Sequence, residues 1–225
     1  MASPAYVFKG DPHSSHSVIL DWLGEGRGRR VLDIGAADGL LARHLGERGW
    51  QVTGIESDPA LAEAGARHCV TMIRADLNTA PPDLADTFDA IVYADVLEHL
   101  VDPLGVLLRL NRTLVPGGAV VVSIPNVAHL WVRFSLLAGR FPYGDRGILD
   151  RTHLRFFTER SLQALLREAR LRVERWTATP VPLHQVVPSV WQGAWLEAVH
   201  AASAAASRRL PRLLGYQFVA LGRPE

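Results

Sequence analysis

Cysteine is almost absent from this sequence, since Cys69 is the only one among 225 residues. A single cysteine excludes a disulfide framework and any metal site built from several cysteines, and it fits a reducing compartment. We therefore expect a cytoplasmic protein. No stretch of about 18 apolar residues is free of charges, so we expect no transmembrane helix and no stable insertion into a membrane. The N-terminus lacks a basic segment followed by an apolar core, which predicts that no signal peptide is present.

An excess of one charge is also missing. The 24 lysines and arginines are matched by 23 acidic residues, which leaves a net charge of +1. A broad basic surface for nucleic acid is therefore not expected, and neither is a nucleic-acid partner. The length suits one α/β domain with a sizeable core. We expect a single domain over residues 1–225, with a helical segment over residues 1–26 at its N-terminus.

Residues 30–45 are the stretch around which the rest of the chain is organised. An apolar strand, with Val31, Leu32 and Ile34, leads through Gly35 and Gly39 into the apolar face of a helix. Asp38 is the expected N-cap of that helix, and Ser15 or Ser17 that of the helix before it. The free N–H groups at a helix start favour a polar or nucleotide-like ligand.

Strand patterns alternate with helix patterns along most of the chain. Further strands are expected at residues 51–56, 71–76, 88–94, 119–124, 171–177 and 217–221. Apolar strands that alternate with helices indicate an α/β protein with a parallel sheet covered on both faces. The alternation breaks after the fifth strand, where an inserted helix is expected at 127–138, and again at 189–209, where an alanine-rich helix precedes the last strand.

Acidic side chains stand at four successive strand ends. They are Asp33, Glu56, Asp76 and Asp95. Ligands of parallel α/β sheets bind outside the carboxyl ends of the strands, so these carboxylates are expected to meet there. Glu56, at the end of the second strand, can accept hydrogen bonds from both hydroxyls of a ribose. Asp76 can accept one from the amine of an adenine.

Five motifs, in order, resemble those of class I S-adenosylmethionine-dependent methyltransferases of the small-molecule branch. They are residues 33–39 (DIGAADG), 54–56 (GIE), 74–77 (RADL), 88–100 (FDAIVYADVLEHL) and 114–118 (LVPGG). The resemblance implies a doubly wound, seven-stranded, mostly parallel Rossmann-like sheet. It also implies a helical lid and acceptor region inserted at 127–157 and a C-terminal helix at 189–209.

The same resemblance implies S-adenosyl-L-methionine as cofactor and S-adenosyl-L-homocysteine as product. The implied binding residues are Asp33, Gly35, Ala36, Ala37, Gly39, Glu56, Ser57, Asp76, Leu77, Ala94 and His16. Small Ala36 and Ala37 let the backbone approach the ligand. Ala37 departs from the family pattern, which commonly has glycine there, and we expect it to keep a negative φ.

Residues 139–144, 147–158 and 214–218 resemble a bacterial subgroup that is often encoded with glycosyltransferases of polysaccharide and specialised-metabolite pathways. This resemblance suggests a small-molecule or sugar acceptor, and O-methylation of a hydroxyl. Methylation of nitrogen or carbon stays open as an alternative, and so does a non-catalytic partner of a glycosyltransferase. A homodimer is also left open.

A hydroxyl acceptor is a poor nucleophile at neutral pH and benefits from a general base, most often histidine. His99 and His153 are the candidates, and Asp95, four residues before His99, is expected to share a helix face with it. Asp150 could orient either histidine. Each histidine could equally be structural, His99 as a helix cap and His153 as a tie between loop and sheet. Asp150 and His153 are too few ligands to predict a metal site, so none is predicted.

The insertion is expected to form the acceptor pocket. Trp131, Phe134, Phe141 and Tyr143 would supply apolar walls, and an arginine could meet phosphate or carboxylate on the acceptor: Arg133, Arg140, Arg146, Arg151 or Arg155. The alternative is that the aromatic residues belong to the core and the arginines are solvated.

Two other enzyme classes fit the sequence less well. A nicotinamide dehydrogenase needs Gly-x-Gly-x-x-Gly after the first strand, and this turn has only Gly35 and Gly39. A nucleic-acid methyltransferase would often carry an Asn-Pro-Pro-Tyr-like motif after the fourth strand, where residues 94–97 read ADVL.

Overall fold

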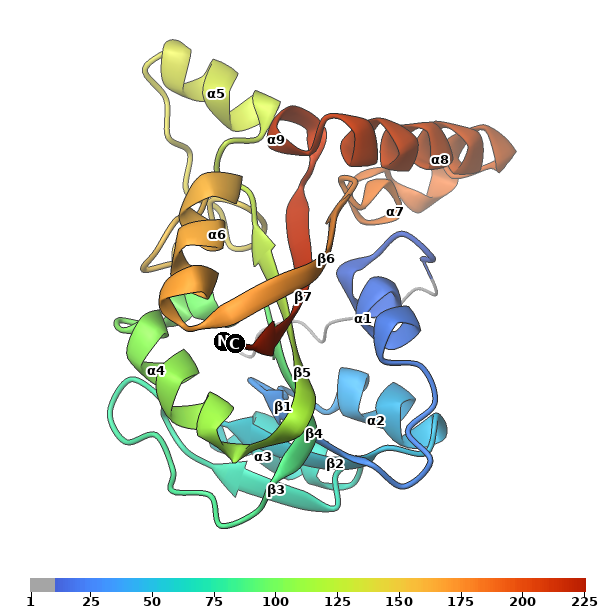
Figure 1. The fold of residues 1–225 in the computed structure, drawn as a ribbon. Helices are drawn as coiled ribbons and strands as arrows, with labels where there is room; N and C mark the ends of the chain where they lie inside the picture. The colour runs from blue at the N-terminus through green and yellow to red at the C-terminus, as the bar shows by residue number, and fades with distance from the viewer. Residues whose placement is uncertain (1–10) are drawn as a thin grey trace.

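Seven strands form one sheet in the computed structural model, which describes residues 11–225 (Figure 1). The strand order is β3-β2-β1-β4-β5-β7-β6. The strands are β1 (Arg30–Ile34), β2 (Gln51–Glu56), β3 (Thr71–Arg74), β4 (Phe88–Ala94), β5 (Leu114–Pro125), β6 (Leu171–Thr179) and β7 (Gln217–Pro224). Strands β1 to β5 pair in parallel, and β7 runs antiparallel to both β5 and β6. The predicted doubly wound, mostly parallel sheet is confirmed. The part of the expected N-terminal helical segment that precedes residue 11 lies outside the described residues.

Both faces of the sheet are covered, and the alternation of side chains along each strand explains why. In β4, Ile91 and Tyr93 join one apolar cluster while Ala90 and Val92 join the other. The first cluster includes residues of α4 (Pro103–Leu110) and α6 (Glu159–Glu168), and the second includes residues of α1 (Ser15–Leu23) and α2 (Leu40–Glu47). Figure 1 shows these two pairs of helices on opposite sides of the sheet.

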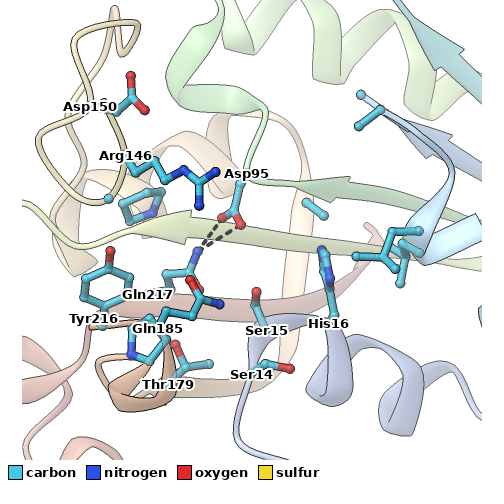
Figure 2. Close-up of a pocket in the computed structure, with 18 of the residues that line it drawn as sticks. Ser14, Ser15, His16, Asp95, Arg146, Asp150, Thr179, Gln185, Tyr216 and Gln217 are labelled. Atoms are coloured by element: carbon cyan, nitrogen blue, oxygen red, sulfur yellow. Dashed lines mark hydrogen bonds between the residues drawn. The ribbon is translucent and has the colours of Figure 1, made fainter. Parts of the chain in front are cut away.

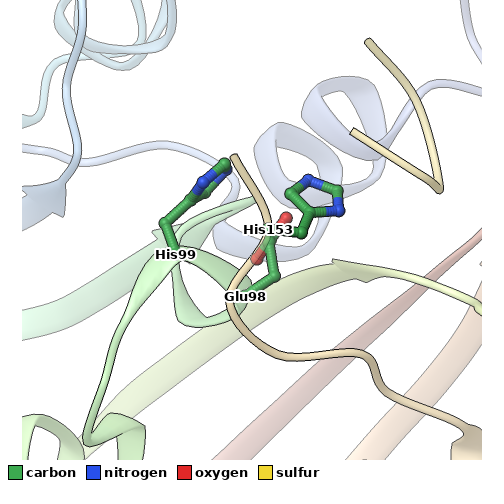
Figure 3. Close-up of side chains that lie close together, drawn as sticks. All are labelled: Glu98, His99 and His153. Carbon is green, nitrogen blue, oxygen red and sulfur yellow. The ribbon is translucent and has the colours of Figure 1, made fainter. Parts of the chain in front are cut away.

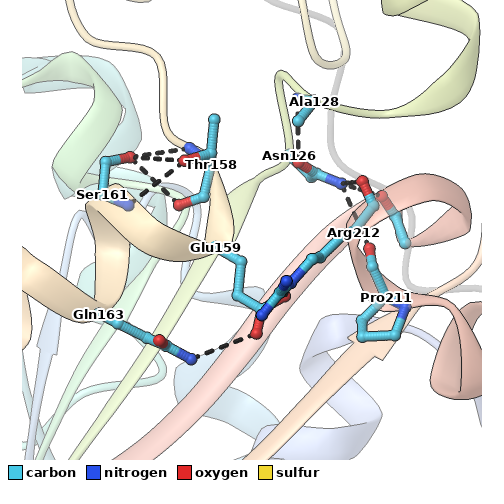
Figure 4. A network of polar contacts seen from close by, with 9 residues as sticks. Asn126, Ala128, Thr158, Glu159, Ser161, Gln163, Pro211 and Arg212 are labelled. Carbon is cyan, nitrogen blue, oxygen red and sulfur yellow. Dashed lines mark hydrogen bonds and ion pairs between the residues drawn. The ribbon is translucent and has the colours of Figure 1, made fainter.

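Polar side chains cap several helix starts. Asp58 accepts two backbone hydrogen bonds at the start of α3 (Pro59–Ala66), and Asp102 accepts one at the start of α4. Thr158 forms a capping box with Ser161 at the start of α6 (Figure 4). Two expectations were wrong. Ser14 caps α1, and α2 is preceded by Gly39 in a left-handed conformation, with no side-chain cap from Asp38.

The remaining helices lie beyond the carboxyl ends of the parallel strands. They are α5 (Leu130–Leu137), α7 (Leu183–Val186), α8 (Ala194–Arg209) and α9 (Pro211–Leu214), with the 3-10 turns η1 (Leu97–His99) and η3 (Ser189–Trp191). A third 3-10 turn, η2 (Asn111–Thr113), lies at the opposite end of the sheet, directly before β5. The C-terminal helix α8 begins at Ala194, five residues later than predicted. The side chain of Gln192 donates to the carbonyls of His184 and Val187, which holds this residue outside the helix. Within residues 11–225, no helix has both the length and the apolar character needed to cross a membrane.

A polar network joins the base of the insertion to the C-terminal helices (Figure 4). The fully buried Asn126, just after β5, donates to the carbonyl of Gly215 at 2.8 Å and accepts from the backbone N–H of Ala128 at 2.9 Å. Glu159 of α6 pairs with Arg212 of α9 at 2.9 Å. These contacts fix the point where β7 begins, which is next to the ends of the parallel strands.

Candidate active site

A cavity of about 420 Å³ lies at the carboxyl ends of β1 and β4 (Figure 2). This is where the strand order reverses, the usual ligand site of such sheets. The N-terminal turn of α1 borders it on one side, and the start of β7 and the loop after α5 border it on the other.

Nine of the predicted site residues line this cavity: His16, Asp33, Gly35, Ala36, Ala37, Ala94, Asp95, His99 and His153. The other five are not lining residues: Gly39, Glu56, Ser57, Asp76 and Leu77. Gly39 faces the backbone of Gly65, and Leu77 packs against the main apolar cluster. Asp76 is exposed and accepts the backbone N–H of Asn78. Contact of these five with a ligand stays a prediction.

The cavity floor carries carboxylate oxygens without partners among the described residues. Asp33 is 2% exposed, and its Oδ2 makes no hydrogen bond; the same holds for Oδ1 of Asp38. Burial and the neighbouring Glu56 raise the pKa of Asp33 to about 7. Buried carboxylates without partners favour a cationic ligand. The floor therefore fits the ammonium and sulfonium groups of S-adenosylmethionine.

Glu56 holds the turn that forms this floor. Its carboxylate accepts the backbone N–H groups of Ala37 at 3.0 Å, Ser57 at 2.7 Å and Asp58 at 2.8 Å. Ala37 has a φ of +46°, so the expected negative φ was wrong. The bond to Glu56 explains how a residue with a Cβ is kept in the left-handed region, which costs an alanine about 1–2 kcal/mol.

We expect Glu56→Ala to weaken the binding of S-adenosylmethionine by about 1.5–3 kcal/mol, the usual value of a hydrogen bond to a charged group. The same change leaves the N–H groups of Ala37, Ser57 and Asp58 without their acceptor, so unfolding by urea should begin at lower concentrations. Glu56→Gln, which keeps one acceptor oxygen, is the matched control. It should lose less donor affinity and less resistance to urea than Glu56→Ala. Calorimetry measures the affinity. An unchanged affinity in Glu56→Ala would remove Glu56 from the donor site.

Asp95 is held in place by a residue at the start of β7 that was not among the predicted site residues. Gln217 Nε2 donates to both carboxylate oxygens of Asp95 at 2.8 and 2.9 Å, and Ser123 donates at 3.1 Å (Figure 2). Burial raises the pKa of Asp95. Asp95 has a φ of +55° and precedes η1, so it does not share a helix face with His99 as expected. Gln217 was missed because only the antiparallel pairing of β7 with β5 brings it to this edge.

The two candidate histidines lie together, although 54 positions separate them in the chain. Their ring centroids are 4.8 Å apart, edge to face, and the carboxylate of Glu98 lies beside them (Figure 3). Burial lowers the pKa of His153, and the neighbouring His99 lowers it further. Burial raises the pKa of Glu98 well above its ordinary value. Glu98 was not among the predicted site residues; its place directly before His99 was the available signal.

Asp150 reaches the histidines indirectly. Its Oδ1 accepts from the backbone N–H and the hydroxyl of Thr152, at 2.8 and 2.7 Å. The carbonyl of Thr152 in turn lies 3.2 Å from Nδ1 of His99. The expected orienting role of Asp150 toward His99 is therefore supported through Thr152.

His16 borders the cavity from the first turn of α1 (Figure 2). Desolvation and the neighbouring His44 lower the pKa of His16 to about 4. The carboxylate of Asp38 raises this pKa, but its effect is smaller. The ring is therefore neutral at physiological pH and can face an uncharged part of a ligand.

The expected aromatic wall of the acceptor pocket was wrong. None of Trp131, Phe134, Phe141 and Tyr143 lines the cavity. Trp131 and Phe134 are exposed on α5, which projects away from the sheet, and Phe141 packs in a small separate cluster (Figure 1). From the insertion, the loop after α5 supplies the lining instead, and Arg146 is the one lining residue among the five predicted arginines.

Comparisons with known proteins agree with this geometry. A family model described as a methyltransferase domain matches residues 15–175. A protein of Xanthomonas oryzae named ubiquinone biosynthesis O-methyltransferase is 31% identical over 176 residues, which is 72% of each chain. A protein of the same name from Alkalilimnicola ehrlichii is 32% identical over 139 residues, 57% of this chain; this chain spans only 56% of that relative.

Among solved structures, a protein of Thermotoga maritima has a similar fold. It is described as a SAM-dependent methyltransferase and possible histamine N-methyltransferase. The TM-score is 0.63 at 18% identity, over 94% of this chain and 88% of that one. At this identity the similarity shows the fold alone.

Proposed function

The chain belongs to the class I S-adenosylmethionine-dependent methyltransferases, and from this premise we propose that it methylates a hydroxyl group of a small molecule or a sugar. S-adenosylmethionine is its methyl donor and S-adenosylhomocysteine the product. A reducing, cytoplasmic location is part of the same proposal, in line with the single free Cys69.

The observation that carries O-methylation is the pair of imidazoles in the cavity. His99 and His153 lie at the same cavity as the carboxylates of the β1 turn. A neutral imidazole is the usual group that makes a hydroxyl nucleophilic at neutral pH, whereas a neutral amine acceptor needs none. The names of the relatives from Xanthomonas oryzae and Alkalilimnicola ehrlichii, both O-methyltransferases, support the same reaction.

The residues divide between the two substrates. When bound, the donor supplies an activated methyl group on a sulfonium. Asp33 and Asp38 offer negative charge to its cationic groups, and Glu56 keeps the β1 turn in shape. Asp95, held by Gln217, lines the same cavity. Arg146 borders the acceptor end and would meet phosphate or carboxylate on the acceptor. Holding the acceptor in line with the methyl group supplies much of the rate.

Two measurements test this function. Calorimetry should show that S-adenosylmethionine and S-adenosylhomocysteine bind and that NAD does not; binding of NAD alone would overturn the proposal. A screen with methyl-labelled donor, beginning with nucleotide sugars and glycosylated metabolites, should then place label on an acceptor oxygen. Label on nitrogen or carbon would overturn O-methylation while keeping methyl transfer. Donor binding with no labelled acceptor in any class would favour the non-catalytic partner.

A further inference from the structure

We propose that Glu98, His99 and His153 form a binding site for one divalent transition-metal ion, of the zinc class, at the acceptor end of the cavity. The inference deepens the proposed function and rests on it, because the ion would bind the acceptor oxygen. The sequence offered only Asp150 and His153 as ligands. The fold places the ligand atoms of Glu98 and His99 beside His153. Asp150 instead accepts a hydrogen bond from the hydroxyl of Thr152.

The first argument is the geometry of the donor atoms. One ligand atom from each of the three side chains lies within 4.8 Å of the others (Figure 3). Ligand atoms around a tetrahedral zinc ion are roughly 3.4 Å apart, so small rotations of the partly exposed imidazoles close the set. Two imidazoles and one carboxylate, with further positions open, are a recurrent set for zinc and iron-class ions.

The second argument is the carboxylate of Glu98. The side chain is 1% exposed and borders the cavity, yet neither of its oxygens has a hydrogen-bond partner in the described part of the chain. A buried carboxylate without a partner is costly, and a bound cation removes that cost. The backbone holds Glu98 in place, because its carbonyl accepts the N–H groups of Leu154 and Arg155, on the loop that carries His153.

The third argument is the orientation of the imidazoles. Nδ1 of His153 lies 3.1 Å from the carbonyl of Ile148, and Nδ1 of His99 lies 3.2 Å from that of Thr152. A carbonyl only accepts, so each ring donates its Nδ1–H, and Nε2 is the nitrogen left for a metal ion. Backbone carbonyls behind Nδ1 are the usual second partners of histidines that bind a metal through Nε2.

An ion held by these three residues would have further coordination positions for an acceptor oxygen. An acceptor hydroxyl bound there would have a lowered pKa and would release its proton to solvent. The histidines would then act through the ion and not as direct proton acceptors. The substrate class is accordingly a small molecule whose reacting hydroxyl can bind a metal.

The test measures metal binding without donor or acceptor. The chain is stripped with a chelator and dialysed against Co²⁺, and bound cobalt is counted and its visible absorption recorded. We expect one Co²⁺ per chain with a d–d spectrum, and at least tenfold weaker binding in Glu98→Gln and in His153→Ala. His68→Ala, which removes the histidine next to Cys69, is the matched control and should bind as the parent does. Circular dichroism checks that each variant is folded.

The outcomes separate this inference from the proposed function. No bound cobalt, or equal binding in the parent and both cluster variants, would overturn the metal site. O-methylation at full rate after chelation would also overturn it, while leaving the proposed function intact. If Glu98→Gln and His153→Ala lose cobalt binding and the acceptor screen yields no methylated hydroxyl, the metal site would be supported and O-methylation overturned.

Discussion

His153→Ala and His99→Ala are each expected to lower turnover on a hydroxyl acceptor by about 10²–10⁴-fold, the usual contribution of a group that activates the nucleophile. Both rings lie in one cluster at the acceptor end of the cavity, so the two losses should not add. The double variant should lose about as much as the more damaging single one. Initial rates at saturating donor, with labelled methyl groups, measure this effect.

Donor affinity is the internal control for the histidine variants. Neither ring contacts the β1 turn in any described hydrogen bond, so S-adenosylmethionine should bind each variant within about twofold of the parent, a difference of less than 1 kcal/mol. Full activity in both single variants would mean that no histidine activates the acceptor. Loss of donor binding together with turnover would point to a structural role for the pair.

Asp33→Asn should weaken the binding of S-adenosylmethionine by at least about 30-fold, because truncating one partner of a buried charge pair costs about 2–5 kcal/mol. Asparagine keeps the size of the side chain, and Asp33 Oδ2 has no hydrogen-bond partner to lose among residues 11–225. Glu63→Gln, an exposed acid on α3, is the control and should bind the donor normally. Unchanged affinity in Asp33→Asn would contradict the assignment.

The pKa of Asp33, raised to about 7 in the free protein, adds a pH signature. The cationic donor prefers the ionised carboxylate, so affinity should fall as the pH drops below 7, by up to about tenfold per unit. The free energy of unfolding should change with pH in the opposite direction. A raised native pKa means that the folded state holds the proton more tightly, so this group's contribution declines as the pH rises from about 4 to about 7. Both slopes should diminish in Asp33→Asn, which calorimetry and urea unfolding at several pH values can check.

Local rules of chain chemistry predicted most of the elements. Asp58 and Asp102 cap their helices, as the Asp-Pro pairs indicate, because the capping bonds span only two or three residues. Apolar runs between helix patterns predicted all seven strands. The pattern is clearest in β1 and β4, where burial on both faces leaves a nearly continuous apolar run. The rules failed where a contact between distant segments decides the conformation. Ala37 takes a positive φ because Glu56, from the next strand, accepts its N–H.

The sequence by itself determined where the proposed donor half of the site lies. The residues of the β1 turn follow directly upon a parallel strand, and parallel strands bring their carboxyl ends to one edge whatever the rest of the chain does. Only the tertiary structure decided which residues form the proposed acceptor half. His153 comes beside His99 and Glu98 through the path of an irregular loop, and Gln217 reaches Asp95 through antiparallel pairing of the last strand. Neither arrangement leaves a periodic signal, because each depends on packing between segments far apart in the chain.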